Sequence, residues 1–357
     1  MKPNELRYYD DEKDNPRTKV EPVMRFSLRF NNDRPVREYM TLAKEAEDQG
    51  FDQFWVSDDL FLYGVWPILA ACATVTQRIQ LGTCIVNPYT MHPAEMAMQV
   101  VALDELSGGR ALLGIGAGAG DFLGWVGLAQ ARPLSRMIET IHVLHALFRG
   151  ERVPHVGAEL GTWSHDAYLR VPTRPIPIYL GAMSPKMLEA IGTYADGGLP
   201  LLFPPEHYQQ ARTRVDVGLA RAGRATHEVD MAACIWVSVG DDAQAAESVL
   251  RQKIAYYGHA LSDTILANLG VARSEFVPIE QAIQHDHDEA RACAMVTPAM
   301  LNIGITGTGA DLLPRLHALA AAGARHISFG PPLGPDPLHA IRVLGRDVLP
   351  VLRAAYQ

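Results

Sequence analysis

The sequence has few cysteines and no long apolar run, and each absence excludes a class of protein. The four cysteines, Cys72, Cys84, Cys234 and Cys293, lie far apart and form no Cys-x-x-Cys pair. Such spacing offers neither a disulfide framework nor a zinc site and is typical of a reducing cytoplasm. No run approaches the ~18 apolar residues of a membrane span, and the polar N-terminus lacks the apolar core of a secretory signal. The sequence therefore predicts a cytoplasmic protein with no membrane partner.

Basic charge is also scarce. The chain has 32 lysines and arginines against 40 aspartates and glutamates, a formal net charge of −8, which argues against a nucleic-acid partner. No Walker loop, G-x-S-x-G elbow or H-E-x-x-H motif supports kinase or hydrolase chemistry. Residues 285–289 resemble a metal-ligand set only by composition, on a segment predicted to be a solvated helix, so no metal site is predicted. A small-molecule substrate is the expected partner.

Apolar residues make up 48% of the 357-residue chain, enough for a large core. Residues 1–22 are polar and predict a flexible extension, whereas strand-like and helical patterns alternate over residues 23–357. Eight runs have the composition of strands: 23–30, 51–57, 79–86, 110–116, 177–182, 197–203, 231–239 and 324–330. This alternation favours a single (β/α)8 TIM-barrel domain. The segment of residues 258–302 is too long for a simple connection, and its composition predicts a helical insertion after strand seven.

A glycine-rich stretch, LLGIGAGAGD, spans residues 112–121. Gly114, Gly116 and Ala119 match the spacing of a dinucleotide-binding fingerprint. However, the stretch follows the fourth predicted strand rather than the first, and the acid at the expected distance, Glu139, falls within an amphipathic helix. The stretch therefore predicts a barrel loop, whose glycines either let a ligand approach the backbone or serve packing at the rim.

Polar residues at the ends of the predicted strands are the candidates for catalysis, because barrel active sites lie there. Arg29 ends strand one, Asp58 and Asp59 follow strand two, and Asn87 follows strand three, with His92 just beyond. If both aspartates face the pocket, their repulsion raises one pKa and makes that group a proton donor; otherwise they cap the next helix. His92 precedes a proline at a helix start, so it either caps that helix or lies near a cofactor.

Four segments carry a resemblance to a known superfamily. They are NPYTMHP (87–93), LDELSGGRALLGIGAG (103–118), PIYLGAMSP (177–185) and SFGPPLGPD (328–336). In this order they resemble the luciferase-like oxidoreductases, and within them methylenetetrahydromethanopterin reductase and its coenzyme F420-dependent relatives. The resemblance covers residues 23–350. It implies F420 over the C-terminal mouth of a barrel, hydride transfer between the deazaflavin C5 and an unsaturated, carbonyl or imine substrate, and a homodimer.

The resemblance also implies roles for individual residues. By the match to GTCIVNPYT, a bulge in strand three would carry a non-prolyl cis peptide between Cys84 and Ile85, behind the deazaflavin ring. Asp58 would approach the coenzyme headgroup. The coenzyme-binding residues implied are Asp58, Cys84, Ile85, Asn87, Gly116, Gly118, Gly181, Ala182, Met183 and Ser184. For catalysis, Asp59 or His92 would handle a proton, and Arg29 would steady developing negative charge.

The chain departs from these relatives at its substrate positions. Arg29 replaces a glutamate, Asp59 replaces a histidine, and Met91 replaces an arginine. An arginine at the active site suggests an anionic or carbonyl-bearing substrate rather than the known ones. Two alternatives share the fold: an FMN-dependent monooxygenase that uses dioxygen, and a non-catalytic cofactor-binding barrel.

Overall fold

Eight parallel strands close into a barrel in the computed structural model, which describes residues 24–152, 154–200 and 204–356. The barrel strands are β1 (Arg25–Phe30), β2 (Gln53–Val56), β3 (Gln80–Thr83), β4 (Ala111–Ile115), β7 (Ile178–Leu180), β8 (Gly197–Gly198), β9 (Asp230–Val239) and β11 (His326–Leu333). Pairing of β8 with β9 closes the ring, so the predicted (β/α)8 TIM barrel is confirmed. The predicted extension, residues 1–22, lies outside the described residues.

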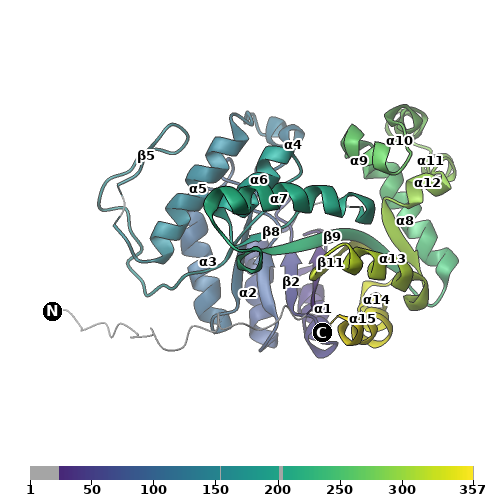
Figure 1. Ribbon diagram of the computed structural model, residues 1–357, viewed down its shortest axis with the longest axis horizontal. Coiled ribbons are helices and arrows are strands. Elements are labelled where there is room, and N and C mark those ends of the chain that lie inside the picture. The colour runs from purple at the N-terminus through teal and green to yellow at the C-terminus, as the bar shows by residue number, and fades with distance from the viewer. Residues whose placement is uncertain (1–23, 153, 201–203, 357) are drawn as a thin grey trace.

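Helices follow the strands and cover the barrel (Figure 1). They are α1 (Val36–Asp48), α2 (Val65–Val75), α3 (Pro93–Ser107), α5 (Pro133–Phe148), α6 (Pro185–Tyr194), α7 (Tyr208–Ala222), α8 (Ala243–Tyr257), α13 (Gly309–Ala321), α14 (Pro337–Val343) and α15 (Leu349–Ala355). The apolar faces of these helices, except that of α8, join the strands in one large buried cluster. Because every strand runs parallel to its neighbours, all strand ends that carry candidate residues meet at one mouth.

Four short elements add to the barrel. A ninth parallel strand, β10 (Gly304–Gly307), pairs with β9 on the outside of the ring. The sequence pattern misses it because two of its four residues are glycine, which carries no strand periodicity. The pattern also misses α4 (Gly120–Trp125). Residues 151–171 contain the expected hairpin, formed by β5 (Val156–Gly157) and β6 (Gly161–Thr162).

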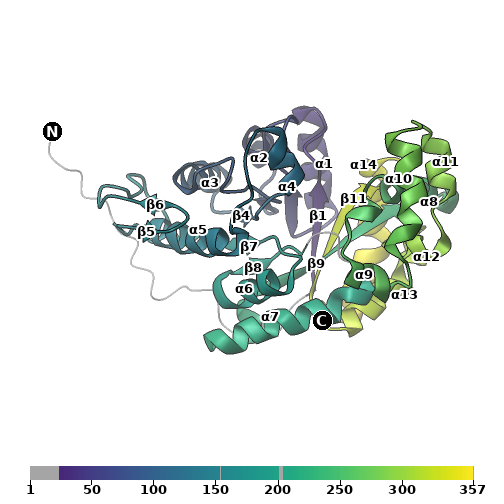
Figure 2. The same ribbon diagram turned by 90° about the horizontal axis from the view of Figure 1, so that it is seen from above.

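Residues 258–302 are mainly helical and carry α9 (Asp263–Asn268), α10 (Val277–Gln284), α11 (Glu289–Ala294) and α12 (Pro298–Leu301). These helices share a second buried apolar cluster with α8, centred on Leu250, Phe276 and Ile279. Figures 1 and 2 both place them beside α8, on the opposite side of the molecule from the β5–β6 hairpin. Since α8 follows β9 directly, this group adjoins the strand-seven side of the barrel.

The barrel interior is filled by side chains rather than open. Trp55 on β2 and Tyr179 on β7 pack edge to face, with ring centroids 4.9 Å apart. Gly82 leaves the space for Trp55, because a Cβ there would lie 2.2 Å from the indole ring. Cys84 and Cys234 complete this buried layer, which lies directly beneath the mouth. The mouth therefore rests on a packed floor.

Gly114, the first glycine of the fingerprint-like stretch, serves strand packing. Its amide and carbonyl both bond the hydroxyl of Thr83 on β3, at 3.0 and 2.8 Å. A Cβ at Gly114 would lie 1.9 Å from the Thr83 carbonyl oxygen.

We expect Gly114→Ala to lower the free energy of unfolding by about 3 kcal/mol, measured by urea denaturation. Gly124→Ala is the control, since a Cβ there meets nothing within 4 Å; equal losses in both variants would contradict this role.

Candidate active site

A bulge in β3 shapes the floor of the mouth. Regular pairing of β3 with β4 covers Leu81 and Gly82, and it resumes only at the bridge between Val86 and Ile115. Three residues of the third strand therefore lie opposite two of β4, which is a β-bulge. The peptide bond between Cys84 and Ile85, within this bulge, is cis. The bulge and the cis bond expected at this position are both confirmed.

The Ile85 side chain lies between two glycine loops. A Cβ at Gly116 would lie 3.0 Å from Ile85 Cγ1, and one at Gly181 would lie 3.1 Å from Ile85 Cγ2. Gly118 has φ +71°, a left-handed conformation that favours glycine, and it faces the side-chain amide of Asn87. Backbone from three strand ends thus meets around one apolar side chain. Such a surface fits a flat ring system, so the residues present fit a deazaflavin coenzyme.

The loop after β7 continues this surface toward α6. Ala182 is buried, whereas Met183 and Ser184 are exposed. The Ser184 hydroxyl caps α6 by accepting a hydrogen bond from the Met187 amide at 3.4 Å. The positive end of this helix, with the Lys186 amide in its first turn, favours an anionic group such as a phosphate. The residues implied for the coenzyme tail therefore lie next to those implied for its ring.

Asn87 holds the backbone of the loop after β3. Its Oδ1 accepts hydrogen bonds from the amides of Tyr89 and Thr90, each at 3.1 Å. Its Nδ2 points to Gly118. The side chain thereby joins the loop after β3 to the glycine loop after β4.

The adjacent carboxylates after β2 have different surroundings. Asp58 Oδ1 accepts a hydrogen bond from the Val65 amide at 3.3 Å, at the first residue of α2. Asp59 Oδ2 lies 3.0 Å from the Ser57 hydroxyl, which is itself 2.9 Å from Oδ1 of the buried Asn32. Burial is the largest cause that raises the pKa of each carboxyl group. Asp58 thus borders a helix start, whereas Asp59 belongs to a polar network below the mouth.

Arg29 lies within the barrel and is only 5% exposed. Its guanidinium donates to Ser328 Oγ at 3.2 Å and to the Ile235 carbonyl at 3.0 Å. Gly330 makes room for it, since a Cβ there would lie 2.2 Å from Nη2. Burial raises the pKa of the nearby Cys84 thiol to about 12, although Arg29 opposes the shift. Cys84 is therefore a neutral packing residue, and Arg29 supplies a fixed positive charge under the mouth.

Lys253, on α8, is a charged residue of the site that the sequence reasoning missed. Burial lowers the pKa of its amine to about 8, while Asp59 and Asp33 favour the charged form and Arg29 opposes it. The only signal in the sequence is a lysine next to the buried Ile254 of an otherwise ordinary amphipathic helix. The structure thus brings Asp59, Arg29 and Lys253 together from three separate segments.

His92 lies at the start of α3 and caps it. Its Nδ1 accepts a hydrogen bond from the Ala94 amide at 3.2 Å. Its ring stacks on Trp163, from the segment after β6, with centroids 5.1 Å apart. These contacts correspond to the structural alternative expected for this histidine.

Glu139 is likewise engaged within the fold. It accepts hydrogen bonds from the amides of Glu159 and Leu160, at 3.2 Å each, and lies 3.1 Å from His155 Nε2. It therefore anchors the hairpin to α5, which agrees with its expected place outside a ribose site.

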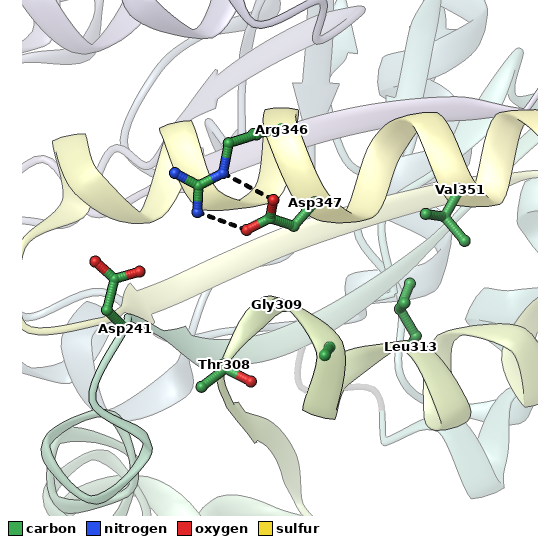
Figure 3. Close-up of a pocket in the computed structure, with 8 residues that line it drawn as sticks. Asp241, Thr308, Gly309, Leu313, Arg346, Asp347 and Val351 are labelled. Atoms are coloured by element: carbon green, nitrogen blue, oxygen red, sulfur yellow. Dashed lines mark hydrogen bonds and ion pairs between the residues drawn. The ribbon is translucent and has the colours of Figure 1, made fainter.

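A cleft of about 530 Å³ lies outside the barrel, between the start of α13 and the C-terminal helices (Figure 3). It is bordered by Asp241, Thr308 and the Arg346–Asp347 ion pair, whose atoms are 2.7 Å apart. Arg346 pairs with Asp347, Asp241 lies 3.0 Å from His339 Nε2, and none of these residues comes from the loops that hold the candidate coenzyme residues. Within the described residues, no group of three or more His, Cys, Asp or Glu could hold a metal ion, and no helix is long and apolar enough to cross a membrane.

Comparison with known proteins agrees with this geometry. The luciferase-like monooxygenase family model matches residues 23–326. The chain belongs to the luciferase-like family. It is similar to 5,10-methylenetetrahydromethanopterin reductase of Archaeoglobus fulgidus, with 32% identity over 334 residues that cover 92% of this chain and all of the relative. The same reductase of Methanolobus tindarius is 33% identical over 327 residues, covering 91% of this chain and all of the relative.

A solved structure of the same branch superposes closely. It is the coenzyme F420-dependent tetrahydromethanopterin reductase from Methanopyrus kandleri, with a TM-score of 0.86 and 28% identity, covering 94% of this chain and 99% of that one. The resemblance to the luciferase-like superfamily and to its F420-dependent branch is confirmed. The chain is an F420-dependent oxidoreductase.

Proposed function

We propose that this luciferase-like enzyme transfers a hydride between the deazaflavin C5 of F420 and an unsaturated, carbonyl or imine carbon of a small molecule. The observation that carries the proposal is the position of Asp59: a half-buried carboxyl of raised pKa, near the Lys253 amine and near Cys84 of the bulge that floors the mouth. Reduction of such a carbon requires one hydride and one proton. A carboxyl that stays protonated to higher pH than usual is suited to supply that proton.

The coenzyme surface is the glycine-lined floor described above, and F420 supplies or accepts the hydride when bound there. The residues we assign to it are Asp58, Cys84, Ile85, Asn87, Gly116, Gly118, Gly181, Ala182, Met183 and Ser184. Ile85 would back the ring, and Ser184 with the start of α6 would face the phosphate. The loops exclude water from one face of the ring, which leaves the other face to the substrate.

Asp59 and Arg29 are the polar residues that we assign to proton transfer and to charge stabilisation, and His92 is not. Asp59 holds or returns a proton at its carboxyl oxygen, in contact with the Ser57 hydroxyl. Arg29 stabilises negative charge that develops on the substrate, because its guanidinium is held by a hydroxyl and a carbonyl and, among the described residues, by no carboxylate. We assign His92 to the start of α3 rather than to the proton, since its Nδ1 already accepts a hydrogen bond.

A coenzyme titration tests this function against the FMN-dependent alternative. Protein prepared without coenzyme is titrated with F420 and with FMN, and binding is followed by fluorescence quenching. We expect saturable binding of F420, weaker binding of FMN, and turnover of reduced F420 with members of a panel of unsaturated acids, ketones and imines. Tight FMN binding with oxygen consumption would instead identify a monooxygenase, and F420 binding without turnover of any panel member would favour a non-catalytic barrel.

The coenzyme surface itself gives a second test. We expect Gly116→Val to raise the Kd for F420 by about tenfold or more, because its side chain would displace Ile85 from the floor. Gly124→Val is the control, since Gly124 is an exposed residue of α4 and a Cβ added there would meet no atom within 4 Å. An unchanged Kd in a folded Gly116→Val protein would place the coenzyme elsewhere.

We further propose that the enzyme acts as a homodimer in a reducing cytoplasm. The three buried cysteines, Cys72, Cys84 and Cys234, are free thiols, which suits a reducing compartment. The dimer is the arrangement that the resemblance implies. Light scattering should give twice the 39.1 kDa chain mass, and a mass equal to that of one chain would contradict the dimer.

A further inference from the structure

Lys253 has the surroundings of a ligand-binding group rather than of a structural ion pair. Its amine lies 4.0 Å above the Tyr257 ring centroid and 5.5 Å from that of Trp236. In the described part of the chain, no hydrogen bond and no carboxylate within 4.0 Å satisfies it. A half-buried ammonium without an acceptor is costly, and aromatic faces offset only part of that cost.

Arg29, the second cation of the site, also lacks a carboxylate partner among the described residues. Arg29 donates to a hydroxyl and a carbonyl and contacts the Cys84 thiol, and no carboxylate lies within ion-pair distance of it among the residues described. Asp59 favours the ammonium form of Lys253, but within the part of the chain that the structure describes its carboxylate makes no ion pair within 4.0 Å with either cation and instead accepts a hydrogen bond from Ser57 at 3.0 Å. The positive charge under the mouth is therefore not balanced by a contact ion pair.

Lys253 also lines a cavity of about 160 Å³. The cavity lies between the ends of β1 and β11, and its apolar wall is formed by Phe30, Pro331, Pro332 and Leu333. Asp33 and Arg34 border it, and Arg34 pairs with Glu38 at 3.4 Å. Since one water takes about 30 Å³, the cavity has room for a fragment of about five or six non-hydrogen atoms.

We propose that Lys253 binds a carboxylate of the substrate and so determines its class: a small unsaturated or carbonyl-bearing acid. The apolar wall would hold the carbon skeleton, and the carboxylate would meet the ammonium. This proposal rests on the proposed function, because it concerns the substrate of that same site. It adds a specificity-determining residue on α8, outside the loops that hold the coenzyme.

The charge of Lys253 depends on all of its neighbours. Asp59 and Asp33 favour the ammonium form, Arg29 opposes it, and the amine loses its proton near pH 8 in the free protein. A bound carboxylate adds a negative charge and must shift the equilibrium back toward the ammonium. This shift can be measured without turnover and without coenzyme.

The probe is crotonate, an unsaturated acid of six non-hydrogen atoms, and its neutral counterpart is crotonamide. The chain has only six lysines, so reductive ¹³C-methylation gives a spectrum in which each lysine can be followed. The resonance lost in Lys253→Arg identifies Lys253. We expect crotonate to raise the measured pKa of Lys253, and crotonamide to leave it unchanged.

Variants provide the second readout, through crotonate binding measured by saturation-transfer NMR. We expect Lys253→Met to raise the Kd for crotonate by about tenfold or more, because a hydrogen bond to a charged group is lost, and Lys253→Arg to retain most of the affinity. Lys44→Met is the control, since Lys44 is exposed and pairs with Asp48 on α1. If crotonate and crotonamide act alike, or if Lys253→Met binds crotonate as the wild type does, the proposal is overturned. Failure of F420 to bind would overturn the proposed function but would leave this result readable.

Discussion

Replacing Asp230 by Asn is expected to lower the free energy of unfolding by about 3 kcal/mol, measured by urea denaturation at pH 7. Asp230 begins β9 at the end of the barrel opposite the mouth. Its carboxylate pairs with Arg25, accepts a hydrogen bond from the Tyr179 hydroxyl at 2.7 Å, and lies 3.1 Å from the buried His326 ring. Removal of its charge leaves the buried Tyr179 and His326, and the partly exposed Arg25, without a carboxylate partner.

The number of strands that this network joins explains the expected loss in the free energy of unfolding. His326 Nε2 lies 2.7 Å from the Ser27 hydroxyl, and Tyr179 receives a hydrogen bond from Gln53 at 3.2 Å. Strands β1, β2, β7, β9 and β11 are thereby joined through one carboxylate. Burial would raise the pKa of Asp230, but His326 and Arg25 hold it well below the ordinary carboxyl value.

The sign of the pH dependence follows from that depressed pKa. A carboxyl whose pKa is lower in the folded than in the unfolded state stabilises the fold above the unfolded pKa of about 3.9. The contribution is lost as the pH falls through the folded value. The difference between wild type and Asp230→Asn should therefore be full at pH 5 to 7 and should narrow below about pH 4.

A surface pair provides the control for Asp230. Asp48→Asn breaks the exposed pair with Lys44 and should cost at most about 0.5 kcal/mol. If Asp230→Asn and Asp48→Asn lose the same small amount of unfolding free energy, the network at the base of the barrel contributes no more to stability than a surface ion pair.

Much of the fold can be predicted from the sequence, because alternating apolar runs specify strands and helices locally. The loops that we assign to the coenzyme are identified in the sequence by resemblance, since Gly116, Gly118 and Gly181 lie in segments that resemble a known family. Gly114 shows the limit of such patterns: it fits a fingerprint by spacing, yet its role is set by contact with Thr83, 31 residues away. Lys253 was missed for the same reason, because only the fold brings α8 to Asp59.

Replacing Asp59 by Asn is expected to lower kcat by about 100-fold or more, the range for loss of a general acid or base. The amide keeps the shape and the contact with Ser57 but cannot exchange a proton at neutral pH. The measurement is oxidation of reduced F420 with the best substrate of the panel, across pH 5 to 9. In the wild type, the rate of substrate reduction should fall as the pH rises through the raised pKa of Asp59, and this limb should disappear in Asp59→Asn.

Two matched readouts separate this role from a structural one. Asp58→Asn should retain the pH dependence of kcat and instead change the Kd for F420, because we assign Asp58, which borders the start of α2, to coenzyme binding. The Kd of Asp59→Asn for F420 should stay within about threefold of the wild type, a difference of less than 1 kcal/mol. An Asp59→Asn enzyme with full kcat and an unchanged pH profile would show that the proton comes from elsewhere.

Stability should move in the opposite direction from activity. A carboxyl whose pKa is raised in the folded state stabilises the fold only at low pH, and that contribution is lost as the pH rises through the folded value. At pH 8 the ionised Asp59 therefore costs stability, and asparagine removes that cost. We expect Asp59→Asn to have a Tm at pH 8 equal to or above that of the wild type, whereas Asp230→Asn should have a much lower one. The proton transfer that we propose for Asp59 would explain why the site retains a destabilising carboxyl.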